Sequence, residues 1–160
     1  MTTPTIIKPA YVTALESAYG APSQSGFGSA VFFQERVNDL EATARFKYKT
    51  FLGKNWEHFG EQVWMRQWRQ VYARAANAPH DIVAELQAVP APEAKISVPM
   101  ILDVVENAAA ARQALSAAYD DEAVSQLVVF NIGDGEAMSG ILIAGLRANG
   151  DATCLVFLMD

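Results

Sequence analysis

Residues 125–160, SQLVVFNIGDGEAMSGILIAGLRANGDATCLVFLMD, decide the fold class of this chain. Two turn dipeptides, Asp134-Gly135 and Asn149-Gly150, divide the segment. Both tolerate the positive φ that tight hairpin turns need, and Asn-Gly is the strongest such signal. The segment therefore predicts a meander of three antiparallel strands, formed by the apolar runs Leu127–Ile132, Ile141–Leu146 and Cys154–Met159.

A two-residue loop at Asn149-Gly150 also predicts how the last two strands pair. The expected partners are Ala148 with Asp151, Leu146 with Thr153, Ala144 with Leu155 and Leu142 with Phe157. One face of this hairpin would then carry Ile141, Ile143, Gly145, Cys154, Val156 and Leu158. Because both faces of the central strand are apolar, we expect helices of the chain or a second subunit to cover both sides of the sheet.

The last strand ends the chain, and this position bears on assembly. If the strand lies at the sheet edge, its unpaired backbone groups favour pairing with another chain. The sequence thus predicts a homodimer built on the terminal strand.

Length and composition describe one globular domain over residues 1–160. The 51% apolar and 19% charged residues exclude a disordered chain. Within the domain we expect a mainly helical part, 1–88, a proline-rich connector, 89–95, and a helix with the meander, 96–160. The start MTTPTIIKPAYV lacks the features of a secretion signal, the single cysteine forms no intrachain disulfide, and no apolar run approaches about 18 residues. We therefore expect a cytoplasmic protein that does not bind membranes.

Charge is distributed unevenly along the chain. Residues 1–44 carry a net charge of −2, residues 45–74 carry +5, and residues 75–160 carry −9. A basic segment thus interrupts an acidic protein. The overall charge of −6 argues against non-specific binding to nucleic acid or anionic membranes, because both depend on positive potential.

Helical periodicity fills the rest of the chain and completes an α+β prediction of about five helices followed by the meander. A helix over Pro9–Tyr19 precedes a loop at 21–29. A long helix is expected from Phe33 to Phe51, although RFKYKTF within it also alternates like a strand. Further helices are expected at 55–77, at His80–Gln87 and at Pro99–Tyr119, the last preceded by a brief strand at Ile96–Val98 or by a lead-in to the helix.

Carboxylates and imidazoles in the middle of the chain form the first candidate site. Two carboxylate pairs are spaced by four residues, so each pair shares a helix face, and a histidine adjoins each pair. Two packed helices could thus bind a metal ion and form a metal-dependent hydrolase, although no metal motif is present. The alternative is that these carboxylates stabilise the N-terminal ends of their own helices. The residues are Glu57, His58, Glu61, His80, Asp81 and Glu85.

The second candidate site is a mixture of aromatic and basic residues. Its predicted ligand-binding members are Trp56, Trp64, Trp68, Arg69 and Tyr72. Such residues are frequent at protein interfaces, and their interleaving with cations is also typical of single-stranded nucleic-acid binders. The alternative is a buried aromatic stripe with a solvated basic side.

The third candidate, the loop NIGDGEAMSG at 131–140, lacks phosphate and calcium motifs and is read as a turn, and Cys154 is placed in the core. No catalytic residue, metal or cofactor is therefore assigned. The sequence predicts a non-catalytic module that binds a protein or a small ligand between the tryptophan helix and the sheet. A metal-dependent hydrolase is the first alternative, and a single-stranded nucleic-acid binder is the second.

Overall fold

The computed structural model describes residues 7–159 and shows an α+β fold with seven helices and a five-stranded antiparallel sheet in that range. Residues 1–6, the first half of the MTTPTIIKPAYV stretch on which the secretion-signal prediction rests, lie outside the described residues. The strands follow the order β1-β5-β4-β3-β2. The elements are α1 (Ala10–Tyr19), β1 (Gly28–Gln34), α2 (Leu40–Leu52), α3 (Lys54–Phe59), α4 (Glu61–Trp64), β2 (Arg69–Ala73), α5 (Ile82–Ala88), α6 (Pro92–Leu102), α7 (Ala108–Tyr119), β3 (Val124–Gly133), β4 (Ser139–Arg147) and β5 (Ala152–Met159).

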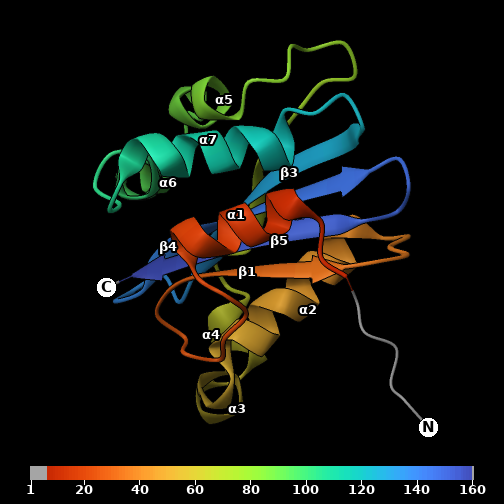
Figure 1. Ribbon diagram of the computed structural model, residues 1–160. Coiled ribbons are helices and arrows are strands. Elements are labelled where there is room, and N and C mark those ends of the chain that lie inside the picture. Colours follow the sequence, from red (N-terminus) through yellow and green to blue (C-terminus); the bar gives the residue numbers. More distant parts are fainter. Residues whose placement is uncertain (1–6, 160) are drawn as a thin grey trace, which may run out of the picture.

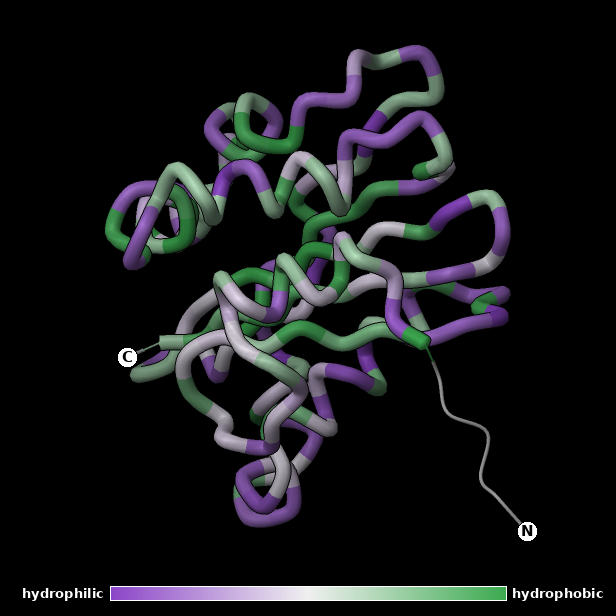
Figure 2. The backbone as a smooth tube through the Cα atoms, in the orientation of Figure 1, coloured by the Kyte–Doolittle hydropathy of each residue, from purple (hydrophilic) through white to green (hydrophobic). Residues whose placement is uncertain are grey.

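Helices cover both faces of the sheet (Figure 1). The helices α1, α5, α6 and α7 pack on one face, and α2, α3 and α4 pack on the other. Each face has its own apolar core, and hydrophobic stretches run along the central strands between the two cores (Figure 2). This confirms the meander and the expectation that both sides of the sheet are covered, and the chain's own helices provide the cover.

The predicted register of the last hairpin is wrong by one residue. The Arg147 amide donates to the Asp151 carbonyl at 2.8 Å and the Gly150 amide donates to Arg147 at 2.9 Å, so the loop has three residues, and Gly150 adopts a φ of +94°. Consequently Leu146 pairs with Ala152 and Ala144 with Cys154. A one-residue shift moves every side chain to the other face. The residues Cys154, Val156 and Leu158 therefore lie in the core under α2, whereas Ile141 and Ile143 lie in the opposite core.

The terminal strand is not at the edge of the sheet. It lies between β4 and β1, and β1 pairs with it along Gly28–Gln34. The edges are formed by β1 and β2, both from the first half of the chain. The edge position on which the terminal-strand interface depended is therefore not met, because a segment about 125 residues earlier pairs with that side of β5, and the homodimer itself stays a prediction.

The long helix predicted from Phe33 begins only at Leu40. The preceding strand β1 buries Ala30, Val31 and Phe32, and Arg36 has a φ of +58°, which ends the strand in a turn. The Asp39 carboxylate then caps α2 by accepting a bond of 3.1 Å from the Ala42 amide. The RFKYKTF segment is helical, as the longer periodicity predicted.

The helix predicted at 55–77 is also divided. Gly60, at a φ of +89°, separates α3 from α4, and the chain then extends into β2, which pairs with β3. The predicted connector is occupied by the start of α6 at Pro92, and that helix continues through Pro99. Asn107 adopts a left-handed φ of +54° and caps α7, so the predicted 99–119 helix is two helices. The predicted helices at Pro9–Tyr19 and His80–Gln87 are confirmed as α1 and α5.

From Ile7 to Met159, every helix is too short or too polar to cross a bilayer.

Candidate functional site

The five predicted ligand-binding residues do not come together in one place. The three tryptophans lie on the face of the sheet covered by α2, α3 and α4, whereas Tyr72 packs against the opposite core and Arg69 pairs with Glu93 of α6 at 2.8 Å. Trp64 is only 3% exposed, and its indole nitrogen donates to the Asn55 carbonyl at 2.9 Å. The alternative of a buried aromatic stripe therefore describes Trp64 better than ligand binding does.

Tyr48 of α2 organises this aromatic core. Its hydroxyl donates to the Trp64 carbonyl at 3.0 Å and accepts from the Gly133 amide at 3.1 Å, and burial raises the pKa of Tyr48 above its usual range. Trp68 stacks on Phe130 with ring centroids 4.5 Å apart and lies 5.7 Å from the Tyr48 ring. The role of Tyr48 had no sequence signal, because Gly133 is 85 positions away.

Exposed aromatic and basic side chains lie on the solvent side of this core. We call this group the aromatic–basic surface, and it comprises Arg45, Phe46, Lys47, Lys49, Lys54, Trp56 and Phe59. Phe46 is 60% exposed and Phe59 is 55% exposed, which is unusual for phenylalanine. A depression of about 180 Å³ lies between the three helices, lined by Arg45, Phe46, Lys49, Trp56, Glu61 and Met65.

The cations of this surface lie over the aromatic rings. The Lys49 ammonium lies 5.7 Å from the centroid of the Trp56 ring, and that of Lys47 lies 5.4 Å from the Phe46 ring. Arg45 pairs with Glu41 at 2.9 Å. Within residues 7–159, Lys47, Lys49 and Lys54 form no ion pair. Much of the positive charge therefore faces solvent without a partner.

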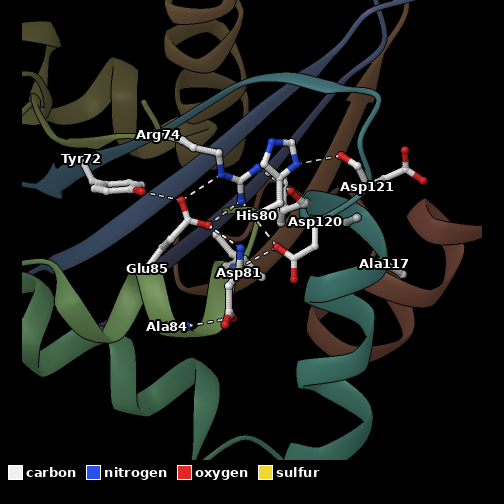
Figure 3. Close-up of polar contacts among 12 residues, drawn as sticks. Tyr72, Arg74, His80, Asp81, Ala84, Glu85, Ala117, Asp120 and Asp121 are labelled. Atoms are coloured by element: carbon white, nitrogen blue, oxygen red, sulfur yellow. Dashed lines mark hydrogen bonds and ion pairs between the residues drawn. The ribbon is translucent and has the colours of Figure 1, made fainter. Parts of the chain in front are cut away.

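The opposite face holds a buried polar network (Figure 3). The Arg74 side chain is 4% exposed and binds Glu85 through two nitrogens, at 2.9 and 2.6 Å. Its remaining nitrogen donates to the Tyr119 carbonyl at 2.8 Å, while Tyr72 donates its hydroxyl proton to Glu85 at 2.5 Å. Asp120 lies 3.5 Å from Arg74 and accepts from the Ile82 amide. The network therefore ties the segment after β2 to α5 and α7.

Burial and hydrogen bonds shift the pKa values of three side chains in this network. Burial raises the pKa of Glu85, but hydrogen bonds from Arg74 and Tyr72 outweigh burial, so the pKa lies below its ordinary value. Burial and the bond to Glu85 raise the pKa of Tyr72 to about 12. Burial also raises the pKa of Asp120. At neutral pH the central Arg74–Glu85 pair is therefore fully charged and satisfied, as a structural ion pair requires.

The structure does not unite the predicted carboxylate site. Glu57 lies in the first turn of α3 and Glu61 begins α4, whereas Asp81 caps α5 and Glu85 lies in its first turn, on the other face of the sheet. Asp81 caps α5 by accepting from the Ala84 amide at 3.3 Å, which is the helix-end role given as the alternative. Across the described chain, no three His, Cys, Asp or Glu residues are placed to hold a metal ion.

The histidines serve local contacts as well. His80 Nδ1 lies 3.1 Å from the Asp121 carbonyl oxygen, and His58 packs edge-on against Phe59. The 131–140 loop is the predicted turn, since the Asp134 carboxylate accepts from the amides of Glu136 and Met138. Cys154 is buried in the core as predicted, and burial raises its thiol pKa to about 12.

Sequence reasoning missed Phe46 and Phe59 as surface residues and Arg74 as the centre of the polar network. Phe59 falls within the helix predicted at 55–77, which the structure divides, and Phe46 falls within the alternating RFKYKTF segment. The one sequence signal that Phe46 is exposed is its helical position, which lies outside the buried stripe of α2. Comparison of the chain with protein-family models, with curated proteins and with solved structures finds no match.

Proposed function

We propose that this chain is a non-catalytic module that binds a protein partner through the aromatic–basic surface on α2, α3 and α4. The observation that carries the proposal is the exposure of Phe46 and Phe59 beside lysines that lack ion-pair partners among residues 7–159. Aromatic and cationic side chains are typical of the energetically important centre of protein interfaces. A phenylalanine that is more than half exposed contributes little to the stability of the isolated chain.

The chemistry of the surface specifies the partner. Lys47 and Lys49 favour carboxylates, and the depression beside Phe46 and Trp56 accepts one apolar side chain. The expected partner is therefore an acidic protein segment with an aliphatic or aromatic anchor residue. At about 180 Å³ the depression is smaller than the roughly 300–1,000 Å³ of ordinary small-molecule sites, so a protein partner fits it better than a free small ligand.

The arrangement of the tryptophans favours a protein over single-stranded nucleic acid. Base stacking needs ring faces that are free, but the Trp64 ring is buried and one face of Trp68 is occupied by Phe130. Nucleic acid is therefore an outcome to be tested and not the proposed ligand.

Selection of peptides from a random display library on the purified chain tests the proposal. Enriched peptides should combine acidic residues with one large apolar residue, and fluorescence anisotropy should give a Kd that rises with salt. Phe46→Ala and the double change Lys47→Glu, Lys49→Glu should each weaken binding about tenfold or more.

The matched control is Ile7→Ala, because Ile7 is 86% exposed and lies outside this surface. This variant should bind the selected peptides like the wild type. Equal binding by the Phe46→Ala variant would refute the proposal. Tight binding of an oligo(dT) probe that the lysine changes abolish would replace it with the nucleic-acid alternative.

A further inference from the structure

We propose that Glu61 selects a tyrosine as the anchor residue of the partner, because its carboxylate accepts a hydrogen bond from the phenol hydroxyl inside the depression between α2, α3 and α4. The inference rests on the proposed function and names the side chain that fills the depression. It concerns the only acidic residue among the described lining residues, whose presence is not explained by the attraction of an acidic segment to lysines.

Glu61 brings an unpaired carboxylate to this depression. It is exposed and is the first residue of α4, which lies beside α2 and α3 on one face of the sheet (Figure 1). Among residues 7–159 it has no ion-pair partner, and Arg45 is paired with Glu41 at 2.9 Å. The Lys49 ammonium lies 5.7 Å from the centroid of the Trp56 ring. In the free chain, solvent is therefore the partner of the Glu61 carboxylate.

An anchor side chain that fills the depression removes part of this solvent. Phe46, Trp56 and Met65 provide the apolar part of the lining, so the body of the anchor should be apolar as well. A carboxylate that loses water without gaining a hydrogen-bond donor costs free energy, however. A purely apolar anchor such as phenylalanine or leucine would therefore leave Glu61 unsatisfied, whereas an anchor with a donor would satisfy it.

The charges around the depression determine which donor fits. Arg45 and Lys49 face one carboxylate, so the lining has a net charge of +1 and disfavours a lysine or arginine anchor. Tyrosine and tryptophan are the side chains that combine an aromatic body with a neutral donor. The phenol is the smaller of the two and carries its donor at the tip of the ring, which suits a depression of about 180 Å³. Acidic residues beside the tyrosine then remain available to Lys47 and Lys49.

Fluorescence anisotropy with a matched series of labelled peptides tests the inference. The most enriched peptide from the display selection is made with tyrosine or phenylalanine at its anchor position. The tyrosine peptide should bind the wild-type chain about tenfold more tightly, because only its hydroxyl hydrogen-bonds to a charged group. The O-methyl ether of tyrosine keeps the ring and the oxygen but cannot donate, so it should bind no better than phenylalanine.

Changes at Glu61 separate the hydrogen bond from packing. Glu61→Gln keeps an uncharged acceptor and should reduce the ratio of the two affinities to about threefold. Glu61→Met keeps a side chain of similar length without a strong acceptor and should abolish the preference for tyrosine. The control is Glu57→Met, because Glu57 is exposed in the first turn of α3 and does not line the depression. This variant should keep the tenfold ratio.

The ratio of the two affinities also guards against misfolding of a variant, because an unfolded fraction lowers the binding of both peptides equally. Equal binding of the tyrosine and phenylalanine peptides by the wild type, or an unchanged ratio in Glu61→Met, would overturn the inference. The proposed function would survive that result, since the acidic peptides would still bind. If no acidic peptide bound the wild-type chain, the proposed function would fail and this inference would fail with it.

Discussion

The two faces of the sheet differ in which groups they bury: one buries an ion pair, and the other buries aromatic rings. Under α5 and α7, the buried Arg74 and Glu85 satisfy each other and draw in Tyr72, Asp120 and a backbone carbonyl. Under α2, the buried groups are aromatic rings held by Tyr48, whereas the lysines and two phenylalanines outside them remain exposed.

This difference separates residues that serve the fold from residues that are free to serve a partner. The role of a buried ion pair lies within the fold, because removing either member leaves a buried charge without a partner and destabilises the folded state. Folding does not explain exposed aromatic rings beside unpaired cations, because contact between an apolar ring and solvent is unfavourable. The α2–α4 side is therefore the side on which we expect binding changes without stability changes.

The largest effect should follow from removing Arg74. Arg74→Met leaves the buried Glu85 carboxylate without its partner and should lower the free energy of unfolding by about 3–5 kcal/mol in urea denaturation. The control is Arg69→Met, because the Arg69–Glu93 pair is largely exposed and should contribute about 0–1 kcal/mol. Equal effects of the two changes would mean that the network is not a stabilising feature of its face.

A smaller effect is expected at the centre of the aromatic face. Tyr48→Phe deprives both the Gly133 amide and the Trp64 carbonyl of their hydrogen-bond partner and should destabilise the chain by about 1–3 kcal/mol. Tyr19→Phe is the comparison and should cost less, since among residues 7–159 the Tyr19 hydroxyl bonds only to the Ile101 carbonyl. If Tyr19→Phe lowered the free energy of unfolding more than Tyr48→Phe in thermal or urea denaturation, the central role of the Tyr48 hydroxyl in the aromatic core would be refuted.

Acid should weaken the polar network before it affects the aromatic face. The pKa of Glu85 is lower in the folded chain than its ordinary 4.5, so its stabilisation is present above that value and is lost as the pH falls through the folded pKa. The free energy of unfolding of the wild type should therefore decrease from pH 5 towards pH 3.

Two variants identify the groups responsible for this pH dependence. Glu85→Gln should flatten the decrease, because it removes the titrating carboxylate. Asp120→Asn should steepen it, because the raised pKa of Asp120 makes that residue stabilise the fold as it protonates. An unchanged pH profile in Glu85→Gln would show that other carboxylates dominate acid unfolding.

The smallest effect on stability should come from the aromatic–basic surface. Phe46→Ser and Lys49→Gln change exposed side chains and should alter the free energy of unfolding by no more than about 0.5 kcal/mol. Their effect belongs instead to peptide binding. A loss of several kcal/mol in Phe46→Ser would show that this ring supports the fold and would remove the contrast between the two faces.

The parts of the fold that could be predicted are those with local signals. The meander follows from apolar runs divided by Asp134-Gly135 and Asn149-Gly150, and α1 follows from periodicity between Pro9 and Gly20. The strands β1 and β2 could not be found in this way. Most of β1 lies between the loop predicted at 21–29 and the helix predicted from Phe33, and β2 lies inside the helix predicted at 55–77. Both strands exist because they pair with β5 and β3, which lie far away in the chain.

The candidate site was predictable only as a region. The basic and aromatic character of residues 45–74 was visible in the sequence, and Trp56 belongs to the resulting surface. The assignment of Trp64, Trp68, Arg69 and Tyr72 to the same site assumed one continuous helix. Gly60 and β2 break that helix, and Tyr72 packs against the opposite core. As a result Trp64, predicted to bind a ligand, is buried, whereas Phe46 and Phe59 are exposed.

The sequence by itself thus determined the α+β class, the meander and the need to cover both faces of the sheet, because short-range turn chemistry and continuous apolar runs express these features locally. Only the tertiary structure decided the five-stranded order, the one-residue register, the internal position of the terminal strand and the identity of the exposed aromatic residues. These depend on backbone pairing and packing between segments distant in the chain, and a shift of a single residue in such pairing exchanges the buried and exposed faces.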